Sequence, residues 1–268
     1  MTSTTPQQKR RLIQADHINL AFSTPNGPFC VLDSLSLVVE AGEFVCVVGP
    51  SGCGKTSLLR ILGGLIPPTA GSVLVDGEPL TTPRRDIGFV FQRANLMPWR
   101  TVLRNVTLPL EIEGLKLAES TPRAERLLDL VGLAGYEASY PKDLSGGMQQ
   151  RVILARALVH DPIALLMDEP FGSLDALTRE RMNLELLRIW STQRQTIVLI
   201  THNIQEAIFL ADRVVVMNSH PGRIVQQIPV PLPRPRALAM QFDDTFGRLV
   251  ERIRMAIGGA PDNPCAAM

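Results

Sequence analysis

A glycine-rich segment near residue 50 has the residue types and spacing needed to bind phosphate groups. This phosphate loop (49–57) carries the complete pattern G-x-x-x-x-G-K-T in Gly49-Pro50-Ser51-Gly52-Cys53-Gly54-Lys55-Thr56, followed by Ser57. The glycines permit backbone angles closed to other residues, so successive N–H groups can turn toward an anion. Lys55 and the start of a helix add positive charge, and the Thr56 hydroxyl can ligate Mg²⁺. We therefore predict a nucleoside triphosphate site with Mg²⁺ rather than a glycine-rich turn that holds no ligand.

Two adjacent carboxylates follow an apolar run later in the chain. Asp168 and Glu169 come directly after residues 164–167, a run typical of a buried strand. Ligands of an open α/β sheet bind at the carboxyl ends of its strands. There Asp168 can hold Mg²⁺ through its water shell, and Glu169 can polarise the water that attacks a γ-phosphate. Alone, such a pair is more often a solvated helix start, but the phosphate loop upstream favours the catalytic interpretation.

A second segment with the character of an anion site is Leu144-Ser145-Gly146-Gly147-Met148. Ser145 is a good helix N-cap, and the two glycines leave the amides of the first helical turn uncovered. The same residues also suit an ordinary helix cap without a ligand. Spacing alone leaves both interpretations open.

The elements that must position these residues alternate between strands and helices, which predicts an α/β fold. Apolar, β-branched runs predict strands at 18–22, 35–39, 45–48, 73–75, 87–92, 163–167, 196–200 and 213–217. Helical periodicity predicts a helix from Lys55 with Leu58, Leu62 and Leu65 on one face, and helices at 177–191 and 204–210.

The region 93–160 differs, because only helical patterns occur there, at 123–131 and 149–159. We interpret it as a helical insert. The proline-rich stretch 221–235 is expected to be irregular, an amphipathic stretch spans 242–257, and the tail 261–268 is expected to be disordered.

Composition narrows the classes of protein that remain. With 45% hydrophobic residues, the chain of 268 residues has enough apolar side chains for a full core. Its formal charge of +1 gives no general affinity for nucleic acid. The polar N-terminal residues and the absence of any apolar run near ~18 residues predict a soluble protein that is not exported. Cys30, Cys46, Cys53 and Cys265 lack metal-ligand spacing, and a disulfide at Cys53 would distort the phosphate loop, so a reduced cytoplasm is expected.

Taken in order, the motifs resemble the ATP-binding cassette of ABC transporters. The matching positions are Gly49–Thr56, Gln92, Leu144–Met148, Met167–Pro170, Ser173-Leu174-Asp175 and His202, and the resemblance extends to about Arg236. It implies a P-loop NTPase fold, in which a RecA-like parallel sheet core carries an N-terminal antiparallel β layer and an inserted helical subdomain. One ATPase domain would span 12–236, with its core at 12–92 and 161–236 and its helical signature subdomain at 93–160, before a C-terminal extension at 237–268.

The resemblance implies roles for single residues around one ATP. Phe22 would stack on adenine, and Phe29 is a rival for that role. The phosphate loop would bind the phosphates, and Thr56, Gln92 and Asp168 would serve Mg²⁺. Glu169 would be the catalytic base, Gln92 would also sense the attacking water, and His202 would contact the γ-phosphate.

The resemblance also implies a site shared between two copies of the chain. Ser145, Gly146, Gly147 and Met148 would close over the ATP held by the other copy, with Asp175 in the segment that bridges the two sites. The usual LSGGQ is LSGGM here, so Met148 lacks a polar side chain. We expect little loss, because the phosphate contacts come from Ser145 and glycine amides.

An apolar cluster, Leu96-Met97-Pro98-Trp99, follows the strand that ends near Gln92. On sequence alone it is either core of the insert or an exposed patch for a partner. The resemblance favours a groove for a membrane subunit, and is closest to the nitrate, sulfonate and taurine importer branch. It therefore implies two membrane permease subunits, an indirect solute-binding protein, and a peripheral position on the cytoplasmic face of the cell membrane.

Two other classes compete with an importer subunit. A soluble ABC ATPase acting on ribosomes or DNA usually carries tandem cassettes or a long coiled-coil insertion, whereas this chain has one phosphate loop and a short insert. A P-loop kinase or switch would not need Leu144–Met148. An importer subunit for a different solute also remains open.

Overall fold

Strand β3, Phe44–Val48, leads directly into the phosphate loop and lies inside a six-stranded sheet. The computed structural model describes residues 10–25, 27–92, 95–219 and 221–258. The strand order is β10-β9-β3-β8-β7-β6, with β6 Ile87–Val90, β7 Ala164–Asp168, β8 Thr196–Ile200, β9 Arg213–Met217 and β10 Ile224–Pro229. The strands from β9 to β6 run parallel, and β10 is antiparallel to β9. All of β3 is buried, as expected of a strand covered on both faces.

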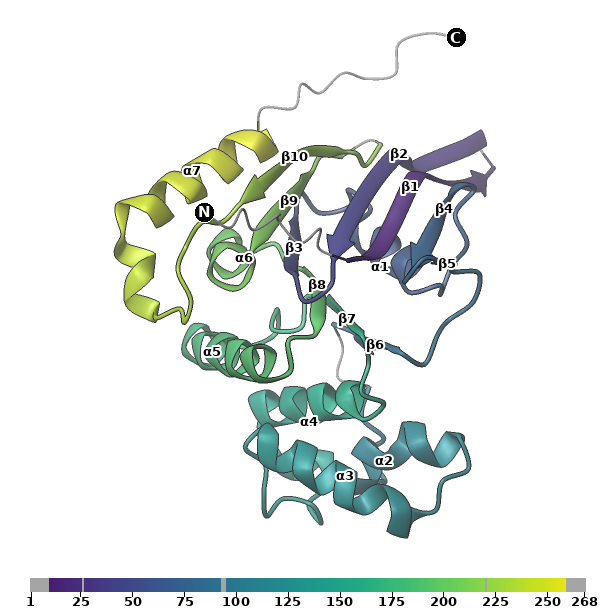
Figure 1. Ribbon diagram of the computed structural model, residues 1–268, viewed down its shortest axis with the longest axis vertical. Helices are drawn as coiled ribbons and strands as arrows, with labels where there is room; N and C mark the ends of the chain where they lie inside the picture. The colour runs from purple at the N-terminus through teal and green to yellow at the C-terminus, as the bar shows by residue number, and fades with distance from the viewer. Residues whose placement is uncertain (1–9, 26, 93–94, 220, 259–268) are drawn as a thin grey trace, which may run out of the picture.

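A second, antiparallel sheet lies beside the first one (Figure 1). Its order is β2-β1-β4-β5, with β1 Arg11–Thr24, β2 Gly27–Glu40, β4 Ala70–Val75 and β5 Glu78–Pro79. Along β2, the buried residues Leu35, Leu37 and Val39 alternate with exposed ones. This period of two turns one face of the hairpin toward the core, so the predicted N-terminal β layer is confirmed.

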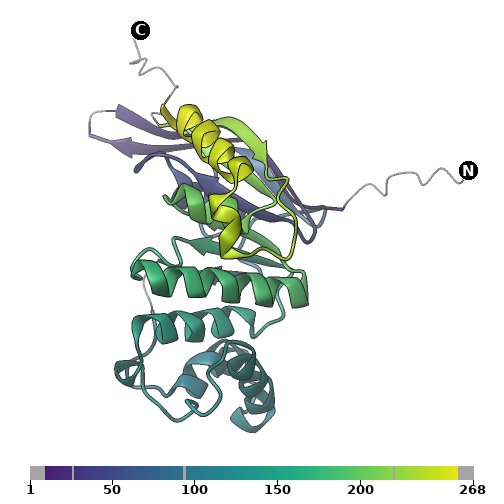
Figure 2. The same cartoon turned by 90° about the vertical axis from the view of Figure 1, so that its left-hand side faces the viewer.

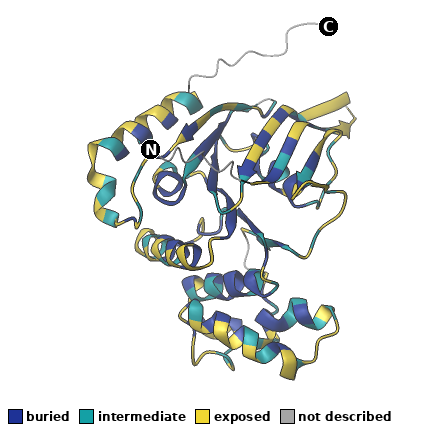
Figure 3. Cartoon of the chain, viewed as in Figure 1, coloured by how far each residue is buried: buried dark blue, intermediate teal, exposed yellow. Residues whose placement is uncertain are grey.

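Two apolar cores lie on opposite faces of the parallel sheet. Val45 and Val47 of β3 pack into a core shared with the antiparallel sheet and with helix α1, Lys55–Leu62. Phe44, Cys46 and Val48 face the other core, which includes residues of α5 (Ala176–Gln193), α6 (Ile204–Leu210) and α7 (Asp244–Gly258). In Figure 3 the central strands of the parallel sheet are mostly buried. Successive side chains of β3 thus point alternately into the two cores, which holds the parallel sheet between the antiparallel sheet with α1 on one side and helices α5, α6 and α7 on the other.

Among the described residues between β6 and β7 there are three helices: α2 Val102–Ile112, α3 Leu117–Leu130 and α4 Gly146–Leu158, with a short 3₁₀ turn, η1, at Pro141–Asp143. They form the end of the molecule away from the antiparallel sheet, with α4 next to α5 (Figure 2). Thr101 caps α2 by accepting a hydrogen bond from the Arg104 amide. The fold is therefore the predicted P-loop α/β core with an inserted helical part.

The structure corrects four expectations. Helix α2 was not predicted, because Pro109 and polar residues interrupt its pattern. Strand β10 lies in the stretch expected to be irregular; an antiparallel edge strand tolerates a terminal proline such as Pro229. The strand expected at 87–92 ends at Val90, so Gln92 lies beyond it. Leu65 is exposed, because α1 already ends at Leu62 before the glycine pair.

The C-terminal part contains a 3₁₀ turn, η2, at Leu238–Phe242 and then α7. The predicted amphipathic stretch is confirmed: Phe246, Leu249 and Ile253 are buried on one face of α7. The expectations for the tail 261–268 and for Cys265 lie outside the described residues. Within the described ranges, no helix combines the length and the apolar character that crossing a membrane requires.

Candidate functional site

The phosphate loop connects the end of β3 to the start of α1, and at two of its positions the backbone geometry requires glycine. Gly54 is the N-cap of α1 with φ of 90°, a conformation that strongly favours glycine. A Cβ atom on Gly49 would lie 2.5 Å from the Met217 carbonyl oxygen of β9. A side chain at either position would therefore move the loop away from the sheet edge. Pro50 and Ser57 are half-buried, and Ser51 and Gly52 are exposed.

Lys55 lies inside the curve of the phosphate loop. Its side chain is only 7% exposed, and Nζ donates to the carbonyl oxygens of Gly49 at 2.9 Å and Pro50 at 2.8 Å. The Cys53 Sγ atom is 3.7 Å from the same Nζ. Burial raises the pKa of the Cys53 thiol, although Lys55 opposes this effect. The loop thus holds a buried cation beside a neutral thiol.

Thr56 and Asp168 meet although 112 residues separate them in the chain. The Thr56 hydroxyl donates to Asp168 Oδ1 at 3.1 Å. Burial raises the pKa of Asp168, and the Thr56 hydrogen bond opposes this shift. One carboxylate and one hydroxyl form an oxygen donor set that suits Mg²⁺, which is commonly held by one or two carboxylates together with phosphate oxygens.

Glu169 is the centre of a hydrogen-bonded group at the carboxyl ends of β7 and β8. Its Oε2 atom lies 3.0 Å from His202 Nδ1, and Gln92 Nε2 donates to the same oxygen at 3.5 Å. The Glu169 amide donates to the Ile200 carbonyl at 2.9 Å, and Glu169 has a φ of 44°. Gln92, predicted to sense the attacking water, and His202, predicted to contact the γ-phosphate, therefore converge on one carboxylate oxygen of Glu169, the predicted base.

Ser145 lies at the start of α4 and caps it, accepting a hydrogen bond from the Met148 amide at 3.3 Å. A Cβ atom on Gly147 would lie 2.9 Å from Thr178 Cγ2 of α5, so glycine permits this close approach, and Leu174 is next to Gly146. Within the described chain, no hydrogen bond or ion pair joins 145–148 to the phosphate loop. One copy of the chain does not bring these two predicted segments together.

Asp175 is the N-cap of α5, the helix that follows the carboxylate pair. Its side chain accepts a hydrogen bond from the Thr178 amide at 3.0 Å. Hydrogen bonds from Thr178 lower the pKa of Asp175. Asp175 thus fixes the start of α5 close to the α4 cap.

Phe22 and Phe29 are direct cross-strand partners in the β1–β2 hairpin. Directly opposed residues project from the same face of a sheet, and both rings are about half exposed, at 49% for Phe22 and 53% for Phe29. The two rivals for adenine stacking therefore occupy one surface, and the choice between them stays a prediction.

The cluster 96–99 divides into a buried and an exposed end. Leu96 is 9% exposed, whereas Trp99 is 72% exposed. Buried Asn105 of α2 fixes the segment between them, since its side chain accepts from the Met97 amide at 2.7 Å and donates to three backbone carbonyls. Of the two interpretations, insert core applies to Leu96 and exposed patch applies to Trp99.

The sequence analysis did not single out a buried polar cluster behind His202. Glu206 of α6 is 5% exposed, and burial raises its pKa, while hydrogen bonds with Thr201 and Asn183 and the charge of Arg179 oppose the shift. Glu206 Oε1 and Asn183 Oδ1 have no hydrogen-bond partner among the described residues. The available signal was a glutamate on the buried face of the short helix predicted at 204–210.

Comparisons with known proteins show the family to which the chain is similar. The family model described as ABC transporter matches residues 32–172. An uncharacterized ABC transporter ATP-binding protein of Methanocaldococcus jannaschii is 48% identical over 224 residues, covering 84% of this chain and 84% of the relative. The nitrate import ATP-binding protein NrtD of Synechocystis sp. is 45% identical over 221 residues, covering 82% of this chain and 83% of the relative.

An aliphatic sulfonates import ATP-binding protein, SsuB of Bacillus cereus, is 42% identical over 225 residues, covering 84% of this chain and 88% of the relative. Among solved structures, the dimeric post-hydrolysis state of the ATP-binding cassette MJ0796 bound to ADP and Pi aligns with a TM-score of 0.73 and 31% identity. It covers 83% of this chain and 100% of that one.

Proposed function

Because the chain belongs to the ABC transporter family of ATP-binding proteins, we propose that it is the ATP-hydrolysing subunit of an importer for a small anion, such as nitrate or a sulfonate like taurine. ATP hydrolysis is the family's activity. The observation that carries the residue-level proposal is the convergence of His202 and Gln92 on Glu169, one residue from the Thr56–Asp168 pair. The names of the nitrate and sulfonate relatives support the class of solute.

In this proposal, each residue near the γ-phosphate has one task. The loop amides and the Lys55 ammonium bind the phosphates, and the Lys55 Nζ exchanges its carbonyl partners for phosphate oxygens. Thr56 and Asp168 would hold Mg²⁺, with Gln92 beside them; the ion would supply charge to stabilise the phosphate oxygens.

Glu169 is the general base. It takes a proton from the attacking water through its carboxylate, whose orientation is fixed by the hydrogen bond with His202 and by Gln92. When ATP is bound, His202 reaches the γ-phosphate. A water molecule between Glu169 and the phosphate would then be positioned for in-line attack.

We further propose that two copies of the chain share each ATP. The uncovered amides at the start of α4, with Ser145 and Gly147, suit an anion, yet the phosphate loop of the same chain does not contact them. The solved structures of the similar cassette MJ0796 are dimeric, which supports this arrangement. Met148 would leave the phosphate contacts to Ser145 and the glycine amides.

The membrane partners would be two permease subunits, contacted through exposed Trp99, with a solute-binding protein acting on their other side. The subunit would lie peripherally on the cytoplasmic face of the membrane. Nothing in the net charge of +1 favours nucleic acid as a partner.

The test is ATP hydrolysis by the complex reconstituted in lipid vesicles with its permease subunits and solute receptor. Nitrate, ethanesulfonate, taurine, which carries its sulfonate in a zwitterion, and an uncharged sugar are compared as stimulants. We expect stimulation by one of the anions that requires the receptor. Stimulation by an uncharged solute alone would contradict the anion assignment while leaving the ATPase assignment intact.

A further inference from the structure

A groove of about 430 Å³ lies between the C-terminal half of α5 and the segment 234–236. We call it the Trp190 groove; its lining includes Leu187, Arg188, Trp190, Arg194, Arg234 and Arg236. The Trp190 ring contacts Phe44 edge-on at 6.0 Å, and Phe44 is the first residue of β3. The groove is therefore at the amino end of β3, whereas the phosphate loop follows the carboxyl end. It is separate from the ATP site.

The four arginines of the Trp190 groove are only partly neutralised. Glu185 pairs with Arg188, and Asp212 pairs with Arg234. In the described part of the chain, neither Arg194 nor Arg236 forms an ion pair: Arg194 lies over the Trp190 ring at 4.9 Å, and Arg236 donates to backbone carbonyls at the end of α6. The groove thus carries two cations without a paired carboxylate.

Two buried N–H groups of the groove also lack acceptors. Trp190 Nε1 and Arg236 Nε have no hydrogen-bond partner among the described residues, although Trp190 is only 3% exposed and Arg236 only 7%. Burial, together with the charge of Arg234, lowers the pKa of Arg236 to about 10. Unsatisfied buried donors are uncommon in folded proteins and normally have a ligand, a water molecule or a functional reason.

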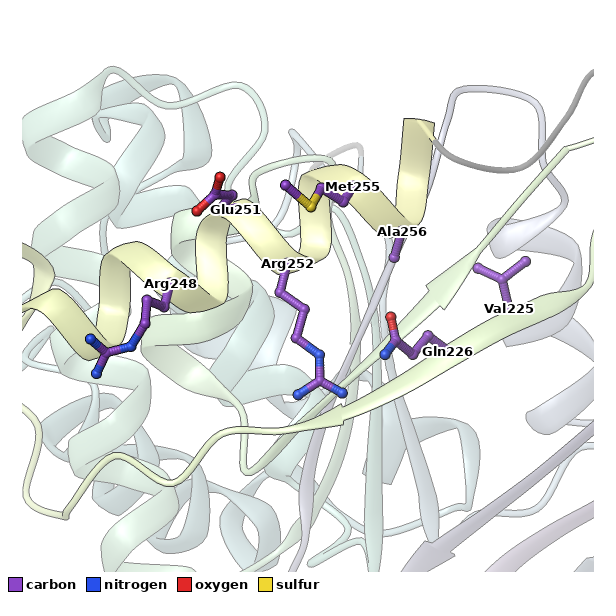
Figure 4. Close-up of a pocket in the computed structure, with 7 residues that line it drawn as sticks. All are labelled: Val225, Gln226, Arg248, Glu251, Arg252, Met255 and Ala256. Carbon is purple, nitrogen blue, oxygen red and sulfur yellow. The ribbon is translucent and has the colours of Figure 1, made fainter.

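The groove between α7 and β10 provides a useful contrast (Figure 4). It also presents two arginines, Arg248 and Arg252, but both are exposed. No side-chain donor lining it is both buried and unpartnered within the described chain. Exposed arginines on a helix are an ordinary solvated surface, so this second groove serves as a control and not as a site.

We propose that the Trp190 groove binds a small organic oxyanion, such as a sulfonate or carboxylate, between Arg194 and Arg236. Guanidinium groups pair with oxyanions through several N–H donors, and two cations without carboxylates attract a negative charge. Leu184 and Leu187 of α5, which line the groove, accept the apolar part of the ligand, since the guanidinium groups of Arg194 and Arg234 lie over the Trp190 ring at 4.9 Å and 4.1 Å. Arg194 is exposed, so its side chain turns from the Trp190 ring to the ligand. This proposal does not depend on which solute is transported.

The experiment uses Trp190 as its own reporter. The chain has two tryptophans, so Trp99→Phe leaves Trp190 as the single one. The full chain carrying Trp99→Phe is saturated with ADP to occupy the phosphate loop, and is titrated with sodium ethanesulfonate against sodium chloride at constant ionic strength. We expect a saturable change in Trp190 emission with ethanesulfonate, confirmed by calorimetry, and none with chloride.

Matched variants decide whether the signal comes from this groove. Arg194→Gln should weaken ethanesulfonate binding about tenfold or more, because it removes a charge-assisted hydrogen bond, whereas Arg194→Lys should retain most of it. Arg252→Gln, in the control groove, should leave the affinity within about twofold. An identical response to chloride, or an unchanged affinity in Arg194→Gln, would overturn the proposal.

Discussion

The Nδ1 atom of His202 lies 3.0 Å from Oε2 of Glu169, and the two residues follow the ends of neighbouring parallel strands. The strand register sets this distance, because Asp168 of β7 pairs with Ile200 of β8. Glu169 and His202 therefore begin their loops almost side by side. A carboxylate held in this way, beside Thr56 and Asp168, can orient a water molecule rather than rotate freely.

The first prediction separates ATP binding from hydrolysis. Lys55→Ala should abolish most ATP binding, because it removes the buried cation of the phosphate loop. Glu169→Gln should leave ATP binding intact and slow hydrolysis about 10²–10⁴-fold, the range for a positioned general base. Nucleotide affinity and steady-state turnover of the purified chain are the measurements.

The control for the charge change is Glu251→Gln, at an exposed position of α7, which should keep normal turnover. Turnover of Glu169→Gln equal to that of the unmodified protein would remove Glu169 from the mechanism.

The second prediction concerns the sharing of each ATP between two copies. Lys55→Ala and Ser145→Arg chains should each be inactive alone. Mixed dimers of the two contain one site with an intact phosphate loop and an intact Ser145, so ATP hydrolysis should partly recover. Activity is measured after mixing differently tagged chains and isolating the heterodimer. If the isolated heterodimer is as inactive as its parents, then one complete site, made of Lys55 from one copy and Ser145 from the other, is not enough for ATP hydrolysis.

The third prediction concerns the pH dependence of stability. Burial raises the pKa of Glu206 above its ordinary value of 4.5, so the folded state binds a proton that the unfolded state has released. This contribution is fully present below pH 4.5 and is lost as the pH rises through the folded-state pKa. Glu206→Gln should remove this pH-dependent contribution. As the pH rises from 4.5 through the folded-state pKa of Glu206, the unfolding free energy of the variant should therefore fall less than that of the unmodified protein.

Denaturant unfolding at several pH values measures this difference. Glu125→Gln on α3 removes an exposed glutamate and should follow the unmodified protein. Parallel pH curves for Glu206→Gln and the unmodified protein would show that Glu206 titrates alike in the folded and unfolded states.

The sequence predicted the parts of this molecule that depend on strong local patterns. The phosphate loop and strands 196–200 and 213–217 have continuous apolar or glycine signals, and they lie where expected. Helix α2 was missed because Pro109 and buried Asn105 obscure its apolar face. Its stability comes from packing against α3 and α4.

Pairs that depend on strand register or on helix packing could not be predicted from local signals. Phe22 and Phe29 pair across the β1–β2 hairpin, and Glu206 of α6 meets Asn183 of α5. In neither pair does the local sequence indicate the partner. The same holds for the groove around Trp190. Trp190 lies in the helix predicted at 177–191, but no local pattern indicates the arginines that the chain brings back beside it at 234–236.

The last prediction concerns the role of Trp99 as a contact for a membrane subunit. Because Trp99 is 72% exposed, Trp99→Ala should change the unfolding free energy of the isolated chain little. Leu96 is 9% exposed, so Leu96→Ala should destabilise the same chain by about 2–5 kcal/mol. Neither residue lies in the phosphate loop, so the ATP affinity of the folded chain should stay near that of the unmodified protein.

Assembly with the permease subunits should respond differently. Truncating a large aromatic anchor commonly costs about 2 kcal/mol or more, which is roughly thirtyfold in affinity. Trp99→Ala should therefore weaken the complex by about that factor and lower transport, whereas Phe242→Ala, which removes an exposed aromatic of η2, should leave assembly unchanged. Binding of each isolated variant to detergent-solubilised permease measures assembly, and solute uptake by the reconstituted complex measures transport. A Trp99→Ala chain that assembles and transports normally would exclude Trp99 from the interface, since exposed aromatic area that binds nothing has no effect when removed.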